Sequence, residues 1–156
     1  GFNRTEAGKD YLTGKQIVDL LVRVVAQNGN LLLNIGPRAD GSVCYEQVKP
    51  LREVGAWLQR NGEAIYGTRP HAPVVCEDQN GTPVYFTRKG DTVYAIFLAE
   101  ELAPRMTIRG YRIPEGRRVA LCGAGRVPWM AEGADTVLQI PEIYERAAAY
   151  AFRIEG

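Results

Sequence analysis

The chain has 156 residues and a mass of 17.3 kDa, and its 19 lysines and arginines against 18 aspartates and glutamates give a formal net charge of +1. This balance excludes the basic footprint typical of a nucleic-acid or anionic-membrane partner, and no apolar run approaches the roughly 20 residues that span a bilayer. A hydrophobic content of 46% with 24% charged residues is typical of a folded globular protein.

The cysteines and the histidine of the sequence do not form the pattern of a metal site or a redox site. Cys44, Cys76 and Cys122 are widely spaced and have no CxxC or CxxH neighbour, and His71 is the only histidine. This spacing is unlike that of a zinc site or a disulfide framework. We therefore expect buried free thiols in a reducing compartment, no metal site, no cofactor and no histidine-based triad.

A helix is predicted for the segment after Thr13. Its apolar residues recur at helical spacing: Ile17, Val18, Leu20, Leu21, Val24 and Val25. Thr13 followed three residues later by Gln16 is a capping-box start. Asn28 and Gly29 form a helix stop.

The run from Asn30 to Ile35 predicts a strand that is buried on both faces. Its three consecutive leucines, Leu31 to Leu33, would place one side chain in water in a half-buried antiparallel strand. A parallel sheet buries both faces, but a single parallel strand cannot pair with itself. The partner strands are therefore expected in an upstream segment, which makes this half a fragment.

A second helix follows, indicated by apolar residues at helical spacing: Val48, Leu51, Val54, Trp57 and Leu58. It is expected to end at Asn61 and Gly62. Pro50 lies inside the pattern, so the helix either starts or bends there.

The pattern becomes all-β after Pro70. The runs 83–88 and 92–98, joined by Lys-Gly-Asp, predict a hairpin. Further short runs, separated by turn residues, follow at 105–110, 117–123, 127–133, 136–141 and 147–155. We expect two regions: residues 1–69, a piece of an α/β domain, and residues 70–156, an antiparallel β-sandwich.

Two long motifs carry a family resemblance. "GNLLLNIGPRADGSV" followed by "VGAWLQRNGEAIYGTRP" resembles the end of the catalytic domain in α-L-fucosidases of glycoside hydrolase family 29. "GFN" at the start is similar to the loop after the preceding barrel strand of that family. "VYFTRKGDTVYAIFL" is similar to the first hairpin of its C-terminal sandwich. The chain departs from the family pattern at Cys44, Pro50 and His71.

The resemblance implies a fold and an activity. Residues 1–69 would be the last helix–strand–helix of a (β/α)8-type barrel, and residues 70–156 the sandwich. The parent protein would be a retaining glycosidase that removes terminal α-L-fucose from glycans or glycosides, without metal or organic cofactor. Retention needs two carboxyl groups about 5 to 5.5 Å apart. In the family these lie upstream, so this chain alone is expected to be inactive and to contain no catalytic residue.

Three residues are the substrate-binding candidates that the resemblance implies. The segment from Asn34 to Asp40 would lie at the carboxyl end of the last barrel strand, where barrel enzymes have their active sites. Asn34 would orient an active-site carboxylate or loop, or else only satisfy backbone groups. Arg38 would meet a ligand at the rim, or remain a solvated loop residue. Phe2 matches an aromatic of a family loop near the fucose methyl group.

Other polar and aromatic residues have structural interpretations. Four carboxylates close to the predicted strand are expected to be structural: Asp40, Glu46, Glu53 and Glu63. Trp57 is expected in the core, between the two regions. Trp129 is open to two interpretations, a platform for sugar stacking or simple packing within the sandwich.

Two other functions remain open from the sequence. The chain could be a non-catalytic carbohydrate-binding or structural β-sandwich module. It could also complete a split glycosidase whose barrel comes from a second chain, as the unpaired leucine strand suggests. If the chain stands alone, that strand could instead pair with a copy of itself in a homo-oligomer.

Overall fold

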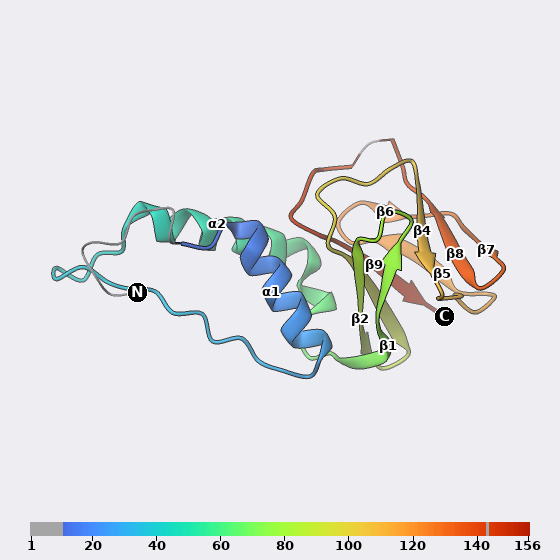
Figure 1. The fold of residues 1–156 in the computed structure, drawn as a ribbon, viewed down its shortest axis with the longest axis horizontal. Helices are drawn as coiled ribbons and strands as arrows, with labels where there is room; N and C mark the ends of the chain where they lie inside the picture. Colours follow the sequence, from blue (N-terminus) through green and yellow to red (C-terminus); the bar gives the residue numbers. More distant parts are fainter. Residues whose placement is uncertain (1–10, 143) are drawn as a thin grey trace.

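The computed structural model describes residues 11–142 and 144–156. Two helices lie at one end of the molecule and a curled sheet at the other (Figure 1). Neither described helix is long and apolar enough to cross a membrane.

The first helix, α1 (Gly14–Ala26), forms as the sequence predicts. The Thr13 side chain accepts a hydrogen bond from the Gln16 backbone N–H, and the Gln16 side chain accepts one from the Thr13 N–H, which completes the capping box. The helix ends before Asn28, whose φ of 66° is the left-handed conformation of a helix stop. Its buried face presents Ile17, Val18 and Val22.

The second helix, α2 (Tyr45–Asn61), contains Pro50 in its interior. Of the two alternatives at Pro50, a start of the helix is excluded, because five residues of helix precede the proline. Its predicted end at Asn61 is confirmed, and a single 3-10 turn, η2 (Gly62–Ala64), follows. A turn over residues 65–67 and the following Thr68 then lead into the first strand.

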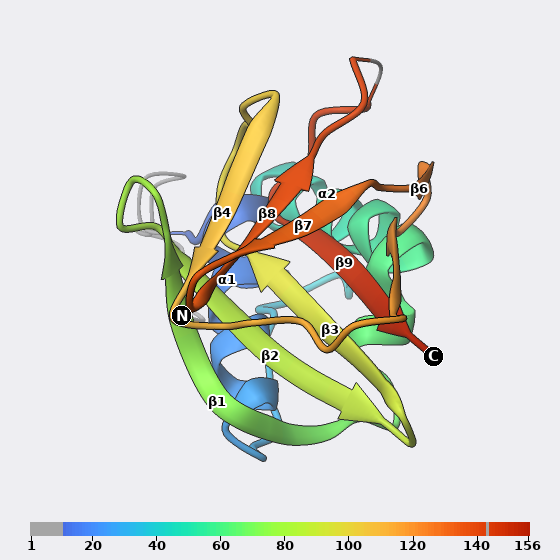
Figure 2. The same cartoon turned by 90° about the vertical axis from the view of Figure 1, so that its right-hand side faces the viewer.

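The nine strands form one antiparallel sheet in the order β6-β5-β9-β3-β2-β1-β4-β8-β7. They are β1 (Arg69–Asp78), β2 (Pro83–Lys89), β3 (Thr92–Phe97), β4 (Arg105–Arg109), β5 (Arg118–Leu121), β6 (Gly125–Arg126), β7 (Trp129–Glu132), β8 (Asp135–Gln139) and β9 (Tyr150–Glu155). The predicted 83–98 hairpin is confirmed, with Gly90 in its turn at a φ of 58°. Figure 2 shows the sheet curling on itself, so its two halves face each other like the sheets of a sandwich.

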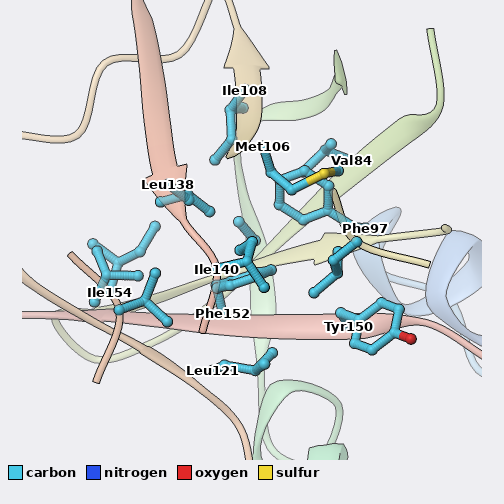
Figure 3. Packing of buried hydrophobic residues seen from close by; sticks show 14 of the residues in the cluster. Val84, Phe97, Met106, Ile108, Leu121, Leu138, Ile140, Tyr150, Phe152 and Ile154 are labelled. Atoms are coloured by element: carbon cyan, nitrogen blue, oxygen red, sulfur yellow. The ribbon is translucent and has the colours of Figure 1, made fainter. Parts of the chain in front are cut away.

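The curl of the sheet encloses an apolar core. Large side chains that are fully buried meet there from strands far apart in sequence, including Phe97, Met106, Ile108, Leu138, Phe152 and Ile154 (Figure 3). The Phe97 and Phe152 rings pack edge to face with centroids 5.2 Å apart. This cluster holds the two halves of the sheet together.

A second apolar cluster joins the helices to the outer face of the sheet. Alternate residues of β3 divide between the clusters: Ala95 and Phe97 face the curl, whereas Tyr94 and Ile96 face the helices. Trp57 of α2 lies in this second cluster, 4% exposed, and its Nε1–H donates to the Ala149 carbonyl at 2.8 Å. The expectation that Trp57 belongs to the core is confirmed.

The segment between the helices differs from the strand predicted for Asn30 to Ile35. It forms no strand, because no described part of the chain offers a neighbouring backbone for a ladder. Leu31 and Leu33 are half-buried and Leu33 packs on the second cluster, but Leu32 is 87% exposed. Two large apolar side chains of the run, Leu32 and Ile35, are therefore exposed.

A paired substitution tests the difference between the buried and the exposed leucine. Leu138→Ala, at a fully buried position, should lower the free energy of unfolding by roughly 2–5 kcal/mol, because it removes buried methyl groups and leaves a cavity. Leu32→Ala on the same chain should change it by less than about 0.5 kcal/mol. Urea unfolding of both variants measures this, and equal losses would contradict the assignment of the core.

Candidate functional site

The loop that follows Asn34 forms a small, closed structure at the start of α2. Pro37 and Val43 pair in an isolated antiparallel bridge, and the Arg38 N–H donates to the Ser42 carbonyl at 2.7 Å. The Gly41 N–H donates to the Arg38 carbonyl at 2.9 Å, and Gly41 has a φ of 82°, which suits a glycine in a tight turn. The loop thus has a defined shape although its side chains are exposed.

Asp40 stabilises this turn and does not face a pocket. Its Oδ1 accepts hydrogen bonds from the Ser42 backbone N–H at 2.9 Å and from the Ser42 hydroxyl at 2.7 Å. These bonds favour the ionised form and hold the pKa of the Asp40 carboxyl below its ordinary value. The contacts are those of an Asx turn, as expected for a structural carboxylate.

Gln47 connects the loop to α2. Its Oε1 accepts the Gly36 N–H at 2.8 Å, and its Nε2 donates to the Gly36 carbonyl at 3.2 Å and to the Cys44 sulfur at 3.2 Å. One amide thereby satisfies both backbone groups of Gly36. The sequence offers no signal for this role, because the partners lie 11 residues apart and belong to different elements.

The structure does not bring Asn34 and Arg38, the two candidates that it describes, together in one hollow. Asn34 is exposed and lines a small hollow of about 70 Å³ with residues of both helices, among them Gln47 and Leu51. Arg38 is exposed at the loop and does not line that hollow. Phe2 lies outside the described residues.

Three further carboxylates were expected to be structural, and each has a position in or after α2: Glu46, Glu53 and Glu63. Glu53 lies 4.0 Å from Lys49 on the exposed side of α2. Glu46 is exposed at the first turn of α2, where a negative charge is favourable, and it lines the same hollow as Asn34. Glu63 belongs to the polar network described next.

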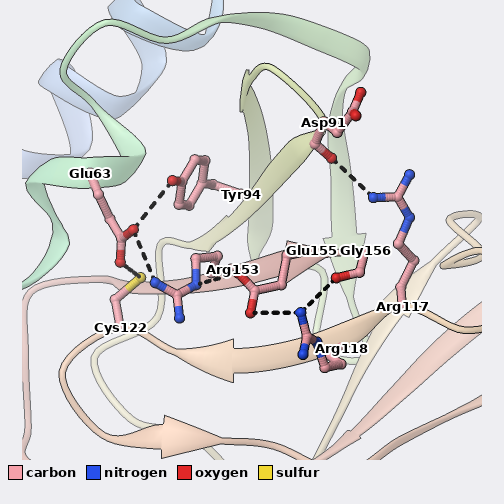
Figure 4. A network of polar contacts seen from close by, with 9 residues as sticks. All are labelled: Glu63, Asp91, Tyr94, Arg117, Arg118, Cys122, Arg153, Glu155 and Gly156. Carbon is pink, nitrogen blue, oxygen red and sulfur yellow. Dashed lines mark hydrogen bonds and ion pairs between the residues drawn. The ribbon is translucent and has the colours of Figure 1, made fainter.

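Glu63 connects the turn after α2 to the sheet. Its Oε2 accepts the Tyr94 hydroxyl at 3.3 Å and lies 3.4 Å from Arg153 Nη1, and its Oε1 accepts the Cys122 thiol at 3.3 Å (Figure 4). Burial, reinforced by the neighbouring carboxylate, raises the pKa of Cys122 and that of Tyr94 to about 12 each. Both groups therefore stay neutral and unreactive, so this network fits a structural role.

The cysteines form neither a disulfide nor part of a metal-binding group among the described residues. All three cysteines are free, as expected, but half-buried instead of buried. Among residues 11–142 and 144–156 there is no group of three or more His, Cys, Asp or Glu side chains that could hold a metal ion.

A wider groove of about 740 Å³ lies between the helices and the loops that precede β4 and β9. Two pairs of its charged side chains compensate each other: Arg60 pairs with Glu145 at 2.5 Å, and Arg146 pairs with Glu101. Glu100 also lines the groove, and within the described residues its carboxylate makes no ion pair.

Comparison with known proteins identifies relatives over nearly the whole chain. The sequence model of the α-L-fucosidase family matches residues 1–63. An α-L-fucosidase of Branchiostoma floridae is 36% identical over 143 residues, which is 90% of this chain and 31% of that protein. Human tissue α-L-fucosidase is 44% identical over 98 residues, 63% of this chain and 21% of that protein.

The fold of a solved structure agrees with these sequence matches. A Thermotoga maritima α-L-fucosynthase superimposes with a TM-score of 0.89 at 29% identity, covering 99% of this chain and 36% of that one. The Branchiostoma and Thermotoga proteins match at least nine-tenths of this chain. The chain in turn spans only about a third of the length of each of these two proteins.

The role of Gln47 as the support of the loop predicts a local change in dynamics. Gln47→Ala removes both contacts to Gly36, so the Gly36 amide should exchange its hydrogen with solvent about fivefold faster, given about 1 kcal/mol for a net hydrogen bond. Gln27→Ala, an exposed control on α1, should leave that rate unchanged. Exchange measured by NMR tests this, and an unchanged Gly36 rate in Gln47→Ala would contradict the assigned role.

Proposed function

This chain belongs to the α-L-fucosidase family and corresponds to the C-terminal portion of such an enzyme. We propose that it completes a retaining fucosidase that removes terminal α-L-fucose from glycans or glycosides. The observation that carries the proposal is structural agreement over 99% of the chain with a fucose-processing enzyme, at a TM-score of 0.89. The relatives lend no support to a free-standing carbohydrate-binding module.

We propose a division of the chain into two parts. Residues 1–69 form the last helix–strand–helix of a (β/α)8-type barrel, and residues 70–156 form the β-sandwich. The support is the run from Leu31 to Leu33, which is extended but unpaired, with Leu32 87% exposed and Ile35 42% exposed. An exposed leucine and an exposed isoleucine in one apolar run are best explained by a partner strand that covers them.

The covering partner is, in this proposal, the preceding part of the same protein. A barrel strand at that position would supply the missing backbone hydrogen bonds and cover Leu32 at once. A barrel from a second chain, as in a split enzyme, or a second copy of this chain would also cover the leucines. These two possibilities are outcomes of the test below.

The chemistry would take place between this chain and that barrel. In this proposal the catalytic carboxylate pair lies in the preceding segment, as the family resemblance implies, and the structural contacts of Asp40, Glu53 and Glu63 are consistent with it. Asn34, Arg38 and Phe2 would contribute substrate-binding groups at the barrel mouth. Asn34 has an exposed amide at the edge of the small hollow, and Arg38 an exposed guanidinium in a loop of defined shape.

An activity assay with a chromogenic α-L-fucoside tests the proposal. The 156-residue chain alone should show no turnover, whereas the chain joined to the preceding catalytic segment should hydrolyse the substrate. Light scattering on the chain alone reports whether a second copy covers Leu31 to Leu33. Recovery of activity when the two pieces are mixed as separate chains would favour the split enzyme.

In the active form, Asn34→Ala should lower kcat/KM by roughly threefold to tenfold, as expected for the loss of one hydrogen bond to a neutral group. Asn80→Ala, an exposed asparagine in the β1–β2 turn, is the matched control and should be neutral. Turnover by a pure 17.3 kDa chain would show instead that the carboxylate pair lies within these 156 residues.

A further inference from the structure

A groove of about 440 Å³ lies on the sheet, where the start of β5 runs beside the segment that joins β6 to β7. The two segments are held together by a hydrogen bond from the Val127 N–H to the Val119 carbonyl at 2.8 Å and one from Trp129 Nε1–H to the Arg117 carbonyl at 2.9 Å. The groove is therefore built on hydrogen-bonded backbone, and its shape does not depend on a flexible loop.

Two arginines on one side of the groove differ in how far their charges are compensated. Within the described residues Arg117 makes no ion pair and donates to the Asp91 carbonyl at 3.1 Å. Arg118 is partly compensated, because it donates to a Gly156 oxygen at 2.7 Å and lies 3.8 Å from Glu155, whose carboxylate also pairs with Arg153 at 3.3 Å. Figure 4 shows Arg117 and Arg118 on neighbouring positions of this segment.

Arg126 supplies a third positive charge from the opposite side. It is exposed, and within the described part of the chain its side chain makes no ion pair or hydrogen bond. The residues that line the groove include three arginines and, among the described residues, no carboxylate. A positive charge of this kind attracts an anion, and guanidinium groups fit the planar oxygens of carboxylates and sulfates especially well.

Trp129 gives the groove an apolar surface beside these charges. The residue is half-buried and packs in part against the core of the sheet, and its only polar atom is already bonded to the Arg117 carbonyl. The rest of the indole lines the groove next to Pro128. The two interpretations of Trp129 left open by the sequence, packing and sugar stacking, are therefore compatible.

We propose that this groove binds an acidic saccharide, whose ring packs on Trp129 and whose carboxylate or sulfate group is held by Arg117, Arg118 and Arg126. A single-stranded nucleic acid also combines stacking with positive charge, but the chain's net charge of +1 gives no extended positive track for a polymer backbone. The site lies on the sheet, apart from the loop around Asn34, and its occupation requires no hydrolysis.

Titration of the full chain with defined oligosaccharides tests this site, followed by NMR or calorimetry. The probes are a heparin-derived tetrasaccharide for sulfate, a galacturonate trisaccharide for carboxylate, and a cello-oligosaccharide as the neutral control. Binding of either acidic probe but not of the neutral one supports the site, and the better probe identifies the anionic group. Failure of both acidic probes to bind overturns it.

Matched variants localise the binding. Arg126→Gln should weaken the acidic probe about tenfold, as expected for a charge-assisted hydrogen bond, whereas Arg52→Gln, an exposed arginine of α2, should leave the affinity unchanged. Trp129→Phe should weaken it as well, with thermal unfolding as a check on its fold. Equal weakening by Arg52→Gln and Arg126→Gln would mean that only the overall charge of the chain matters, and would overturn the proposal. Binding of a single-stranded oligonucleotide more tightly than the acidic saccharides would also overturn it.

Discussion

The contact between the helix pair and the sheet is the interaction on which the rest of the structure depends. Trp57 lies at its centre, almost fully buried and hydrogen-bonded to the Ala149 carbonyl at 2.8 Å. The same contact explains why β3 is buried on both faces, since Tyr94 and Ile96 face the helices while Phe97 faces the curl. Without the helices one face of the central strands would be exposed, and without the sheet the helices would have no core.

This contact also fixes the position of the segment that the proposed function requires. Because α1 and α2 are held on the sheet, the chain that joins them must run along their side, and Leu33 packs there while Leu32 does not. Glu63 ties the end of α2 to the sheet through Tyr94, Cys122 and Arg153. In the proposed function, this base presents the apolar run from Leu31 to Ile35 and the shaped loop to the preceding part of the protein.

The sequence was informative where a local pattern sets the structure. The capping box of α1, the hairpin of β2 and β3 and the core position of Trp57 follow from residue type and spacing, and the structure confirms them. Strand β1 was not recognised, because Pro70 and Pro73 interrupt its pattern and its residues are largely exposed. The roles of Gln47 and Glu63 were also missed, since their partners lie 11 to 90 residues away and no local pattern encodes such contacts.

We propose that the leucine run is a barrel strand whose partner strand precedes it in the sequence. Amide hydrogen exchange at Leu31 to Leu33 tests this most directly, measured on the 156-residue chain as a monomer and on the same chain joined to the preceding catalytic segment. We expect fast exchange in the 156-residue chain and strong protection in the joined chain, because the ladder hydrogen bonds form only with the partner strand. Slow exchange in the monomeric chain alone, or fast exchange in both, would contradict it.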